Sequence, residues 1–152
     1  MQKIIIADTS CLIILHKIGH LTLLKDVFKT VYITAIVAKE FGVELPAWIT
    51  VTNPINIDFQ IILNASVDLG EASAIALAFE HKHALIILDD LKARKLATSL
   101  NLVFTGTFGF IIMAKTLGKL TSVKTIIDKI KLTNFHITPE LEQQILEKSG
   151  EL

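Results

Sequence analysis

The sequence lacks features that mark several classes of protein, beginning with paired cysteines and an excess of one charge. Cys11 is the only cysteine, which excludes an intramolecular disulfide framework and suggests a reducing compartment such as the cytoplasm. Fifteen basic and fifteen acidic residues cancel, so the overall charge indicates no polyanionic or membrane partner. Apolar residues, in contrast, make up 51% of the 152 residues, which excludes a disordered chain and is enough for the core of one domain.

Long apolar runs are also missing. The run at residues 4–7 is too short for the core of a signal peptide, and an acid follows it at Asp8. Residues 96–114 carry no charge and approach the length of a membrane span, but the turn residues Thr-Gly-Thr at 105–107 divide them. We therefore expect two buried elements in this stretch and no membrane partner.

The charges are unevenly distributed along the chain. Residues 1–81 hold five lysines and eight acids, residues 82–131 hold nine basic residues and three acids, and residues 137–152 hold one lysine and four acids. The middle segment could present a basic face to a phosphate backbone. The same lysines could equally be the solvated faces of surface helices, and charge alone does not decide between the two.

Short apolar segments alternate with helical segments, without a repeat or a linker. This alternation predicts one α/β domain over residues 1–152, with a three-layer α/β/α arrangement around a parallel sheet and a C-terminal extension helix within 133–152. Thr9 or Ser10 is expected to cap the first helix, and Ser66 or Asp68 a later one. Strands are expected at 3–7, 31–33, 84–88 and 102–104, with a short strand containing Trp48 between Pro46 and Pro54. Helices are expected at 9–18, 21–28, 34–41, 70–81, 90–100, 107–117, 122–131 and 139–148, whereas 58–63 fits either a strand or a helix.

Acidic residues follow the ends of the predicted strands. Asp8 comes directly after the first strand, and Asp89 and Asp90 follow residues 84–88. Glu71 lies in the first turn of a helix, and Glu40 lies late in another, beside its apolar face. Because ligands bind beyond the carboxyl ends of parallel strands, we expect these carboxylates to gather at one rim.

Each of these acids also has an ordinary structural explanation as a helix cap, a complement to a helix dipole or one half of an ion pair. Gathered in one cleft, however, they would repel one another, and a cation with hard oxygen ligands would remove the repulsion. Mg²⁺ or Mn²⁺ is the expected ion, and such ions promote phosphodiester hydrolysis. A zinc site is not favoured, because Gly19 interrupts the helix between His16 and His20 and no third ligand is adjacent.

Taken together, these motifs resemble the PIN-domain family, the metal-dependent nucleases that include VapC-type toxins. The resemblance covers essentially the whole chain and is to a subgroup described only as nucleic-acid binding. The matching segments are Ile-Ile-Ala-Asp-Thr-Ser at 5–10, an acid near residue 40, Leu-Gly-Glu-Ala-Ser-Ala-Ile-Ala-Leu-Ala at 69–78, Leu-Asp-Asp at 88–90 with Arg94 and Ala97, and Thr-Gly-Thr-Phe-Gly at 105–109.

The resemblance implies strand order 3-2-1-4-5, an acidic pocket that binds Mg²⁺ or Mn²⁺, and cleavage of RNA. The family's four acids correspond to Asp8, Glu40, Glu71 and Asp90, with Asp89 as an alternative for the fourth, and Ser10 matches the hydroxyl partner of the first. Two positions depart from the pattern. Glu71 stands where many of these toxins have aspartate, and His136 stands where arginine is expected.

The preferred interpretation is a metal-dependent endoribonuclease, the toxin of a toxin–antitoxin pair, with RNA and a small antitoxin as partners and a homodimer as its expected assembly. The alternative is a PIN-like module that binds nucleic acid without cleaving it. Lys92, Arg94 and Lys95 are expected to contact the nucleic-acid backbone, unless they form a solvated helix face or Arg94 pairs with a pocket acid. A phosphoacceptor domain is disfavoured, because it needs two acids after the first strand and Asp8 stands alone there, and because of the position of Glu71. A haloacid-type phosphatase is disfavoured, because Ser10 stands where its second acid would be.

Overall fold

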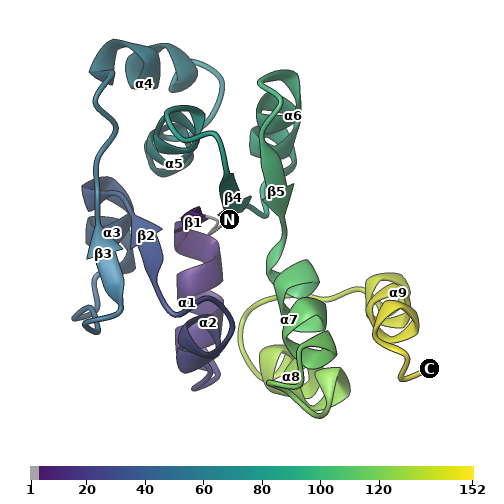
Figure 1. Cartoon of the computed structure of the whole chain (residues 1–152). Coiled ribbons are helices and arrows are strands. Elements are labelled where there is room, and N and C mark those ends of the chain that lie inside the picture. The colour runs from purple at the N-terminus through teal and green to yellow at the C-terminus, as the bar shows by residue number, and fades with distance from the viewer. Residues whose placement is uncertain (1–3) are drawn as a thin grey trace.

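The computed structural model describes residues 4–152, which form a five-stranded parallel sheet between two layers of helices (Figure 1). The strands are β1 (Ile4–Ala7), β2 (Val31–Ile33), β3 (Ile49–Val51), β4 (Ala84–Ile87) and β5 (Val103–Thr105). Their order is β3-β2-β1-β4-β5, which confirms the predicted topology. The central strand β1 pairs with β2 at Ile6 and Tyr32, and with β4 at Ile6 and Ile86.

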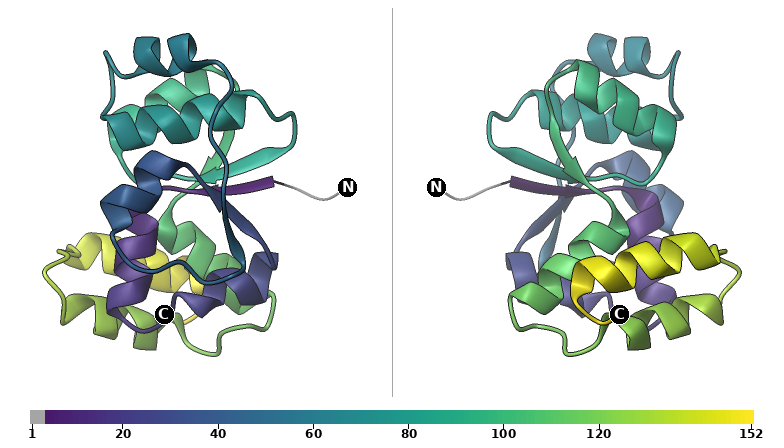
Figure 2. Two further views of the ribbon diagram at one scale, coloured as in Figure 1. Left: turned by 90° about the vertical axis from the view of Figure 1, so that its left-hand side faces the viewer. Right: turned by 90° about the vertical axis from the view of Figure 1, so that its right-hand side faces the viewer.

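Alternating side chains of the strands pack into two hydrophobic cores, one on each face of the sheet. Ile5 and Ala7 of β1 point to the larger core, with helices α1, α2, α3, α7, α8 and α9, whereas Ile6 points to the smaller core, with α4, α5 and α6. Figure 2 shows the sheet edge-on between these two layers. The helices are α1 (Thr9–Lys17), α2 (Thr22–Phe28), α3 (Ala35–Phe41), α4 (Ile57–Leu63), α5 (Leu69–Phe79), α6 (Leu91–Ser99), α7 (Thr107–Thr116), α8 (Val123–Lys131) and α9 (Pro139–Ser149).

The expected elements are present, with boundaries that differ by one or two residues. The ambiguous segment at 58–63 is helix α4, and Trp48 lies just before β3 rather than within it. The prediction that Thr9 or Ser10 caps the first helix was wrong, because the carboxylate of Asp8 accepts the backbone N–H of Cys11 and so caps α1 itself. Asp68, not Ser66, caps α5. The start of the first strand at Lys3 lies outside the described residues.

The uncharged stretch at 96–114 is divided as its turn residues predict. It contributes the end of α6, the strand β5 and most of α7, with the turn at Gly106 between the last two. Among residues 4–152, none of the helices combines the length and the apolar character that crossing a lipid bilayer requires.

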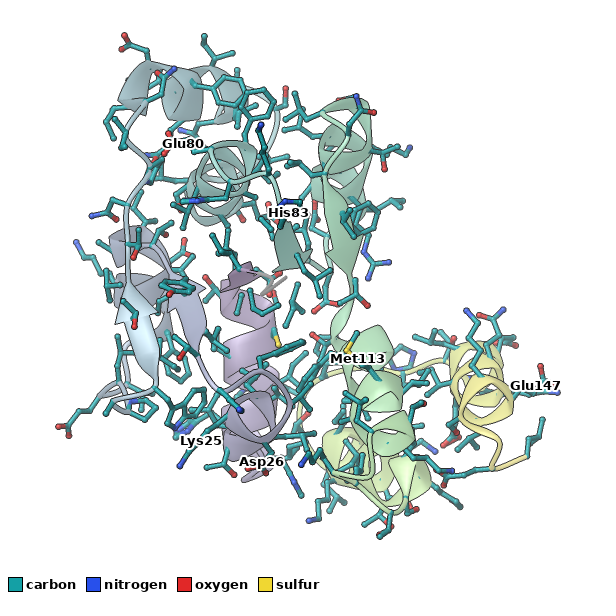
Figure 3. The ribbon with its side chains drawn as sticks, viewed as in Figure 1. Lys25, Asp26, Glu80, His83, Met113 and Glu147 are labelled. Atoms are coloured by element: carbon teal, nitrogen blue, oxygen red, sulfur yellow. The ribbon has the colours of Figure 1, made fainter. Side chains whose placement is uncertain are left out.

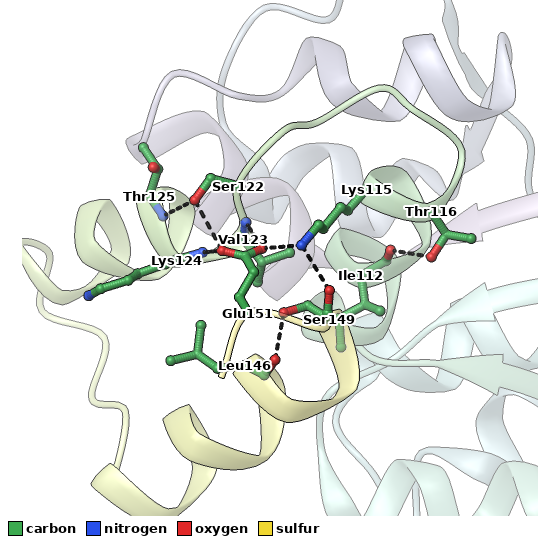
Figure 4. A network of polar contacts seen from close by, with 10 residues as sticks. All are labelled: Ile112, Lys115, Thr116, Ser122, Val123, Lys124, Thr125, Leu146, Ser149 and Glu151. Carbon is green, nitrogen blue, oxygen red and sulfur yellow. Dashed lines mark hydrogen bonds and ion pairs between the residues drawn. The ribbon is translucent and has the colours of Figure 1, made fainter.

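The C-terminal segment is fastened to the domain by Glu151, which is the penultimate residue (Figure 4). Its carboxylate accepts hydrogen bonds from the Ser122 hydroxyl at 3.1 Å and from the backbone N–H groups of Val123 and Lys124 at 2.6 and 3.1 Å. It also pairs with Lys115 of α7 at 2.8 Å. One side chain therefore caps α8 and joins the end of α9 to α7.

Candidate active site

Asp8 lies at the carboxyl end of the central strand and is only 3% exposed. Its Oδ1 accepts the backbone N–H of Cys11 at 2.9 Å, and its Oδ2 accepts the backbone N–H of Asp89 at 3.3 Å. Burial, and second the negative charge of Asp89, raise the pKa of Asp8 to about 7. The carboxylate is thus held in one orientation, in surroundings that disfavour its negative charge.

A small hollow at this edge of the sheet brings together acids from the end of β1, from α3 and from the start of α5. Its volume is about 40 Å³, and we call it the acidic hollow. It is lined by Asp8, Thr9, Ser10, Glu40, Asp68 and Glu71. Four of the residues expected from the sequence, Asp8, Ser10, Glu40 and Glu71, therefore lie around one space although 63 positions separate the first from the last.

Glu40 reaches the hollow from the last turn of α3. Its Oε1 accepts a hydrogen bond from the Thr9 hydroxyl at 2.5 Å. The carboxylate lies directly against Gly70 of α5, where a Cβ atom would collide with it. Glycine at position 70 therefore allows α3 and α5 to bring Glu40 close to Glu71.

Glu71 lies in the first turn of α5, and its backbone N–H donates to Asp68 Oδ1 at 3.0 Å. Partial burial, followed by the negative charges of Asp68 and Asp90, raises the pKa of Glu71 to about 7. Asp68 is an acid of the hollow that the sequence analysis treated only as a helix cap. The sequence spacing could have predicted this, because an acid at the N-cap and an acid three residues later face one another across the first turn of a helix.

The two neighbouring aspartates after β4 have different partners. Both oxygens of Asp89 are engaged by Thr107, whose backbone N–H donates at 2.8 Å and whose hydroxyl donates at 2.5 Å. Asp90 caps α6 through the backbone N–H of Ala93 at 3.0 Å. It lines a second hollow, which it shares with Asp68, Glu71 and Lys92. Neither aspartate lines the acidic hollow, but Asp90 faces Glu71 and Asp89 is turned toward Thr107.

The basic residues of α6 also differ in their surroundings. Arg94 donates from Nε to the carbonyl oxygen of Leu88 at 2.7 Å, lies over the ring of Phe104, and pairs with Asp89 at 3.7 Å. Its pairing with an acid is the structural alternative considered above, although 35% of its side chain is still exposed. Lys92 borders the second hollow beside Asp90, and Lys95 is exposed on the same helix.

The donor atoms of the acidic hollow suit a hard divalent cation. They are carboxylate and hydroxyl oxygens. Burial first, and neighbouring negative charges second, raise the pKa values of Asp8 and Glu71, and a bound cation would offset both effects by favouring the charged carboxylates. Nowhere in residues 4–152 do three histidine, cysteine, aspartate or glutamate side chains already stand close enough to hold a metal ion. The carboxylates would therefore have to turn toward one another to bind it.

Comparison with known proteins gives one positive result. Residues 4–151 match a family model described as a PIN domain, so the match spans nearly the whole chain. No curated protein and no solved structure matches the chain significantly.

Proposed function

The chain belongs to the PIN-domain family of nuclease-type modules, and on this premise we propose that it is an endoribonuclease that hydrolyses RNA with Mg²⁺ or Mn²⁺. The observation that carries the proposal is the acidic hollow. Four carboxylates, those of Asp8, Glu40, Asp68 and Glu71, line one small space at the carboxyl edge of a parallel sheet. Without a cation this arrangement is electrostatically unfavourable, which suggests that it exists for binding rather than for stability.

Each residue has a distinct role in this proposal. Asp8, fixed by two backbone N–H groups, is the rigid ligand, while Glu40 and Glu71 turn in from α3 and α5 to complete the set. Asp90 contributes negative charge beside Glu71. The exposed hydroxyl of Ser10 lies on the rim, where it can donate to a phosphate oxygen. The divalent cation, when bound, stabilises the negative charge that develops on the phosphate oxygens during hydrolysis.

The proposal is tested by incubating the purified protein with a structured RNA labelled at both ends. We expect internal cleavage with Mg²⁺ or Mn²⁺ and none with EDTA. Asp58→Asn is the matched control for an asparagine substitution of an acid in the hollow. Asp58 is an exposed acid on α4 outside the hollow, so its substitution should leave cleavage unchanged. Cleavage that persists in EDTA, or shortening only from the ends, would contradict the proposal.

We propose further that the chain is the toxin of a toxin–antitoxin pair in the cytoplasm and forms a homodimer. The support is a group of exposed apolar side chains on and beside α4, namely Ile55, Ile57, Ile61 and Ile62, which a partner would cover. Expression in bacteria should stop growth, and a small open reading frame next to the gene should encode a protein that restores it. Normal growth during expression of the active protein would exclude the toxin role.

The alternative, a PIN-like module that binds RNA without cleaving it, is favoured by one observation. No three metal-ligating side chains in the described part of the chain converge as they stand. In that case the protein would bind RNA equally well with EDTA or Mn²⁺ and would leave the RNA intact. The cleavage assay therefore separates the two functions directly.

A further inference from the structure

A third space, larger than the acidic hollow and separate from the hollow beside Asp90, lies between α6, α7 and α9 and has a volume of about 250 Å³. Arg94 lines it from α6 and Lys148 from α9, and we call it the basic cavity. Its other walls include Phe108 and Ile112 of α7 and Gln144 of α9. The right-hand view of Figure 2 shows α9 crossing the molecule below α6, so these two helices bound the cavity from opposite sides.

The basic cavity and the acidic hollow are joined by a short series of contacts. Asp8, in the acidic hollow, accepts the backbone N–H of Asp89, and the carboxylate of Asp89 pairs with Arg94, which lines the basic cavity. Both spaces therefore lie along the carboxyl edge of the sheet, on either side of Asp89. An extended nucleic-acid strand that crosses this edge would reach both spaces.

The linings of the two spaces are chemically opposite. The acidic hollow has four carboxylates and no cation among its lining residues. The basic cavity has two cations and an amide, and no acid of the described chain lines it. Glu147, the acid next to Lys148, points outward from α9 in Figure 3, and Asp89 is already paired with Arg94.

The position of Arg94 is set before any ligand arrives. Its Nε is held by the carbonyl of Leu88, and a Cβ atom at Gly106 would collide with its guanidinium. Glycine at position 106 therefore lets the charged group lie against the backbone at the edge of the cavity. A guanidinium has five N–H donors, so donors remain for a phosphate after these contacts are made.

We propose that the basic cavity binds one nucleotide of the RNA, next to the phosphodiester that is cleaved in the acidic hollow. The cations Arg94 and Lys148 contact its phosphate, Gln144 hydrogen bonds to its polar edge, and the apolar walls at Phe108 and Ile112 accept its base. The choice of RNA as ligand rests on the proposed function.

The test uses the full-length protein, 5′-uridine monophosphate and EDTA, so that it depends neither on a metal nor on cleavage. With the isoleucine methyl groups labelled for NMR, titration should shift the signals of Ile112 and Ile145, which line the cavity, and leave exposed Ile62 unchanged. Reversing one cation with Lys148→Glu should weaken binding about tenfold, the effect of losing one charge-assisted contact. Lys25→Glu changes an exposed lysine of α2 (Figure 3) that does not line the cavity, and should leave binding unchanged.

The outcomes separate this proposal from the proposed function. If the wild-type protein cleaves RNA but the nucleotide shifts no cavity methyl, or Lys148→Glu and Lys25→Glu behave alike, the basic cavity is not a nucleotide site. If the cavity binds the nucleotide but the protein cleaves no RNA, the cavity assignment stands and the nuclease assignment fails. If both hold, Lys148→Ala should raise KM for RNA several-fold and leave kcat unchanged.

Discussion

The backbone N–H of Asp89 donates a hydrogen bond to Asp8 Oδ2 at 3.3 Å and so joins the ends of β4 and β1. The backbone N–H of Cys11 in α1 donates to the other oxygen, so the buried Asp8 carboxylate is held from two sides, by α1 and by the end of β4. The side chain of Asp89 then extends the network to Thr107 and Arg94. The acidic hollow and the basic cavity are thus two parts of one connected edge.

The metal-free protein should become less stable as the pH rises toward neutrality. Folding raises the pKa of Asp8 from 3.8, and that of Glu71 from 4.5, to about 7. Between about pH 4 and pH 7 the folded state therefore holds protons that the unfolded chain has released, and the free energy of unfolding falls as the pH increases. Urea denaturation in EDTA at pH 5, 6, 7 and 8 measures this slope. The double variant Asp8→Asn, Glu71→Gln should flatten it, and an unchanged slope would contradict the assigned pKa values.

Asp89 and Asp90 should respond differently to the same substitution. Asp90→Asn keeps the α6 cap, because asparagine caps a helix as well as aspartate does. The free energy of unfolding should therefore change by less than about 0.5 kcal/mol, whereas RNA cleavage should fall. Asp89→Asn removes an acceptor for Thr107 and the partner of Arg94, and should destabilise the fold by about 1–3 kcal/mol. Denaturation and cleavage measured on both variants decide this, and the reverse pattern would make Asp89 the acid that serves the reaction.

Gly70→Ala should reduce activity without reducing stability. The added Cβ would displace the Glu40 carboxylate from its place against α5. Glu40 is exposed and its side chain can move away, while alanine favours the helix over glycine by up to about 1 kcal/mol. We expect equal or higher thermal stability, with a loss of Mn²⁺-dependent cleavage. Wild-type cleavage by this variant would show that the position of Glu40 does not matter.

Glu151→Gln should loosen the C-terminal segment. Burial alone would raise the pKa of Glu151, but hydrogen bonds from Lys115, two backbone N–H groups and the Ser122 hydroxyl outweigh it and lower this pKa from 4.5 to about 2. The ionised Glu151 carboxylate therefore makes its full contribution to the free energy of unfolding above pH 4.5, and this contribution is lost as the pH falls toward about 2. At pH 7 the free energy of unfolding of the variant should be about 1–2 kcal/mol lower than that of the wild type, and this difference should shrink at low pH. Glu147→Gln changes an exposed acid of α9, is the control and should match the wild type.

Much of the fold and part of the site could be predicted from local sequence patterns. The buried run at residues 84–87 and the caps at Thr34 and Asp68 act within a few residues, so their signals are visible in the chain. The segment at 57–63 has isoleucines that fit either period, and the cap at Asn56 together with packing against α5 selects the helix.

The remaining features depend on residues that are distant in sequence. Asp89 and Asp90 look equivalent in the chain, and Thr107, 18 residues later, turns the first of them away from Glu71. The basic cavity needs Lys148 from the last helix to lie opposite Arg94, which no local pattern indicates. A metal site is visible neither in local sequence patterns nor in the side-chain positions of residues 4–152, where no three acidic, histidine or cysteine side chains converge.

The central claim, that the acidic hollow binds the cation with which RNA is cleaved, is tested most directly by comparing the wild type with Asp8→Asn in Mn²⁺. We expect millimolar Mn²⁺ to raise the melting temperature of the wild type and to start cleavage. Asp8→Asn should fold and melt cooperatively, but with little shift from Mn²⁺ and at least about 100-fold less cleavage, because it loses the charge that holds the ion. A folded Asp8→Asn variant that cleaves RNA at the wild-type rate would contradict the claim.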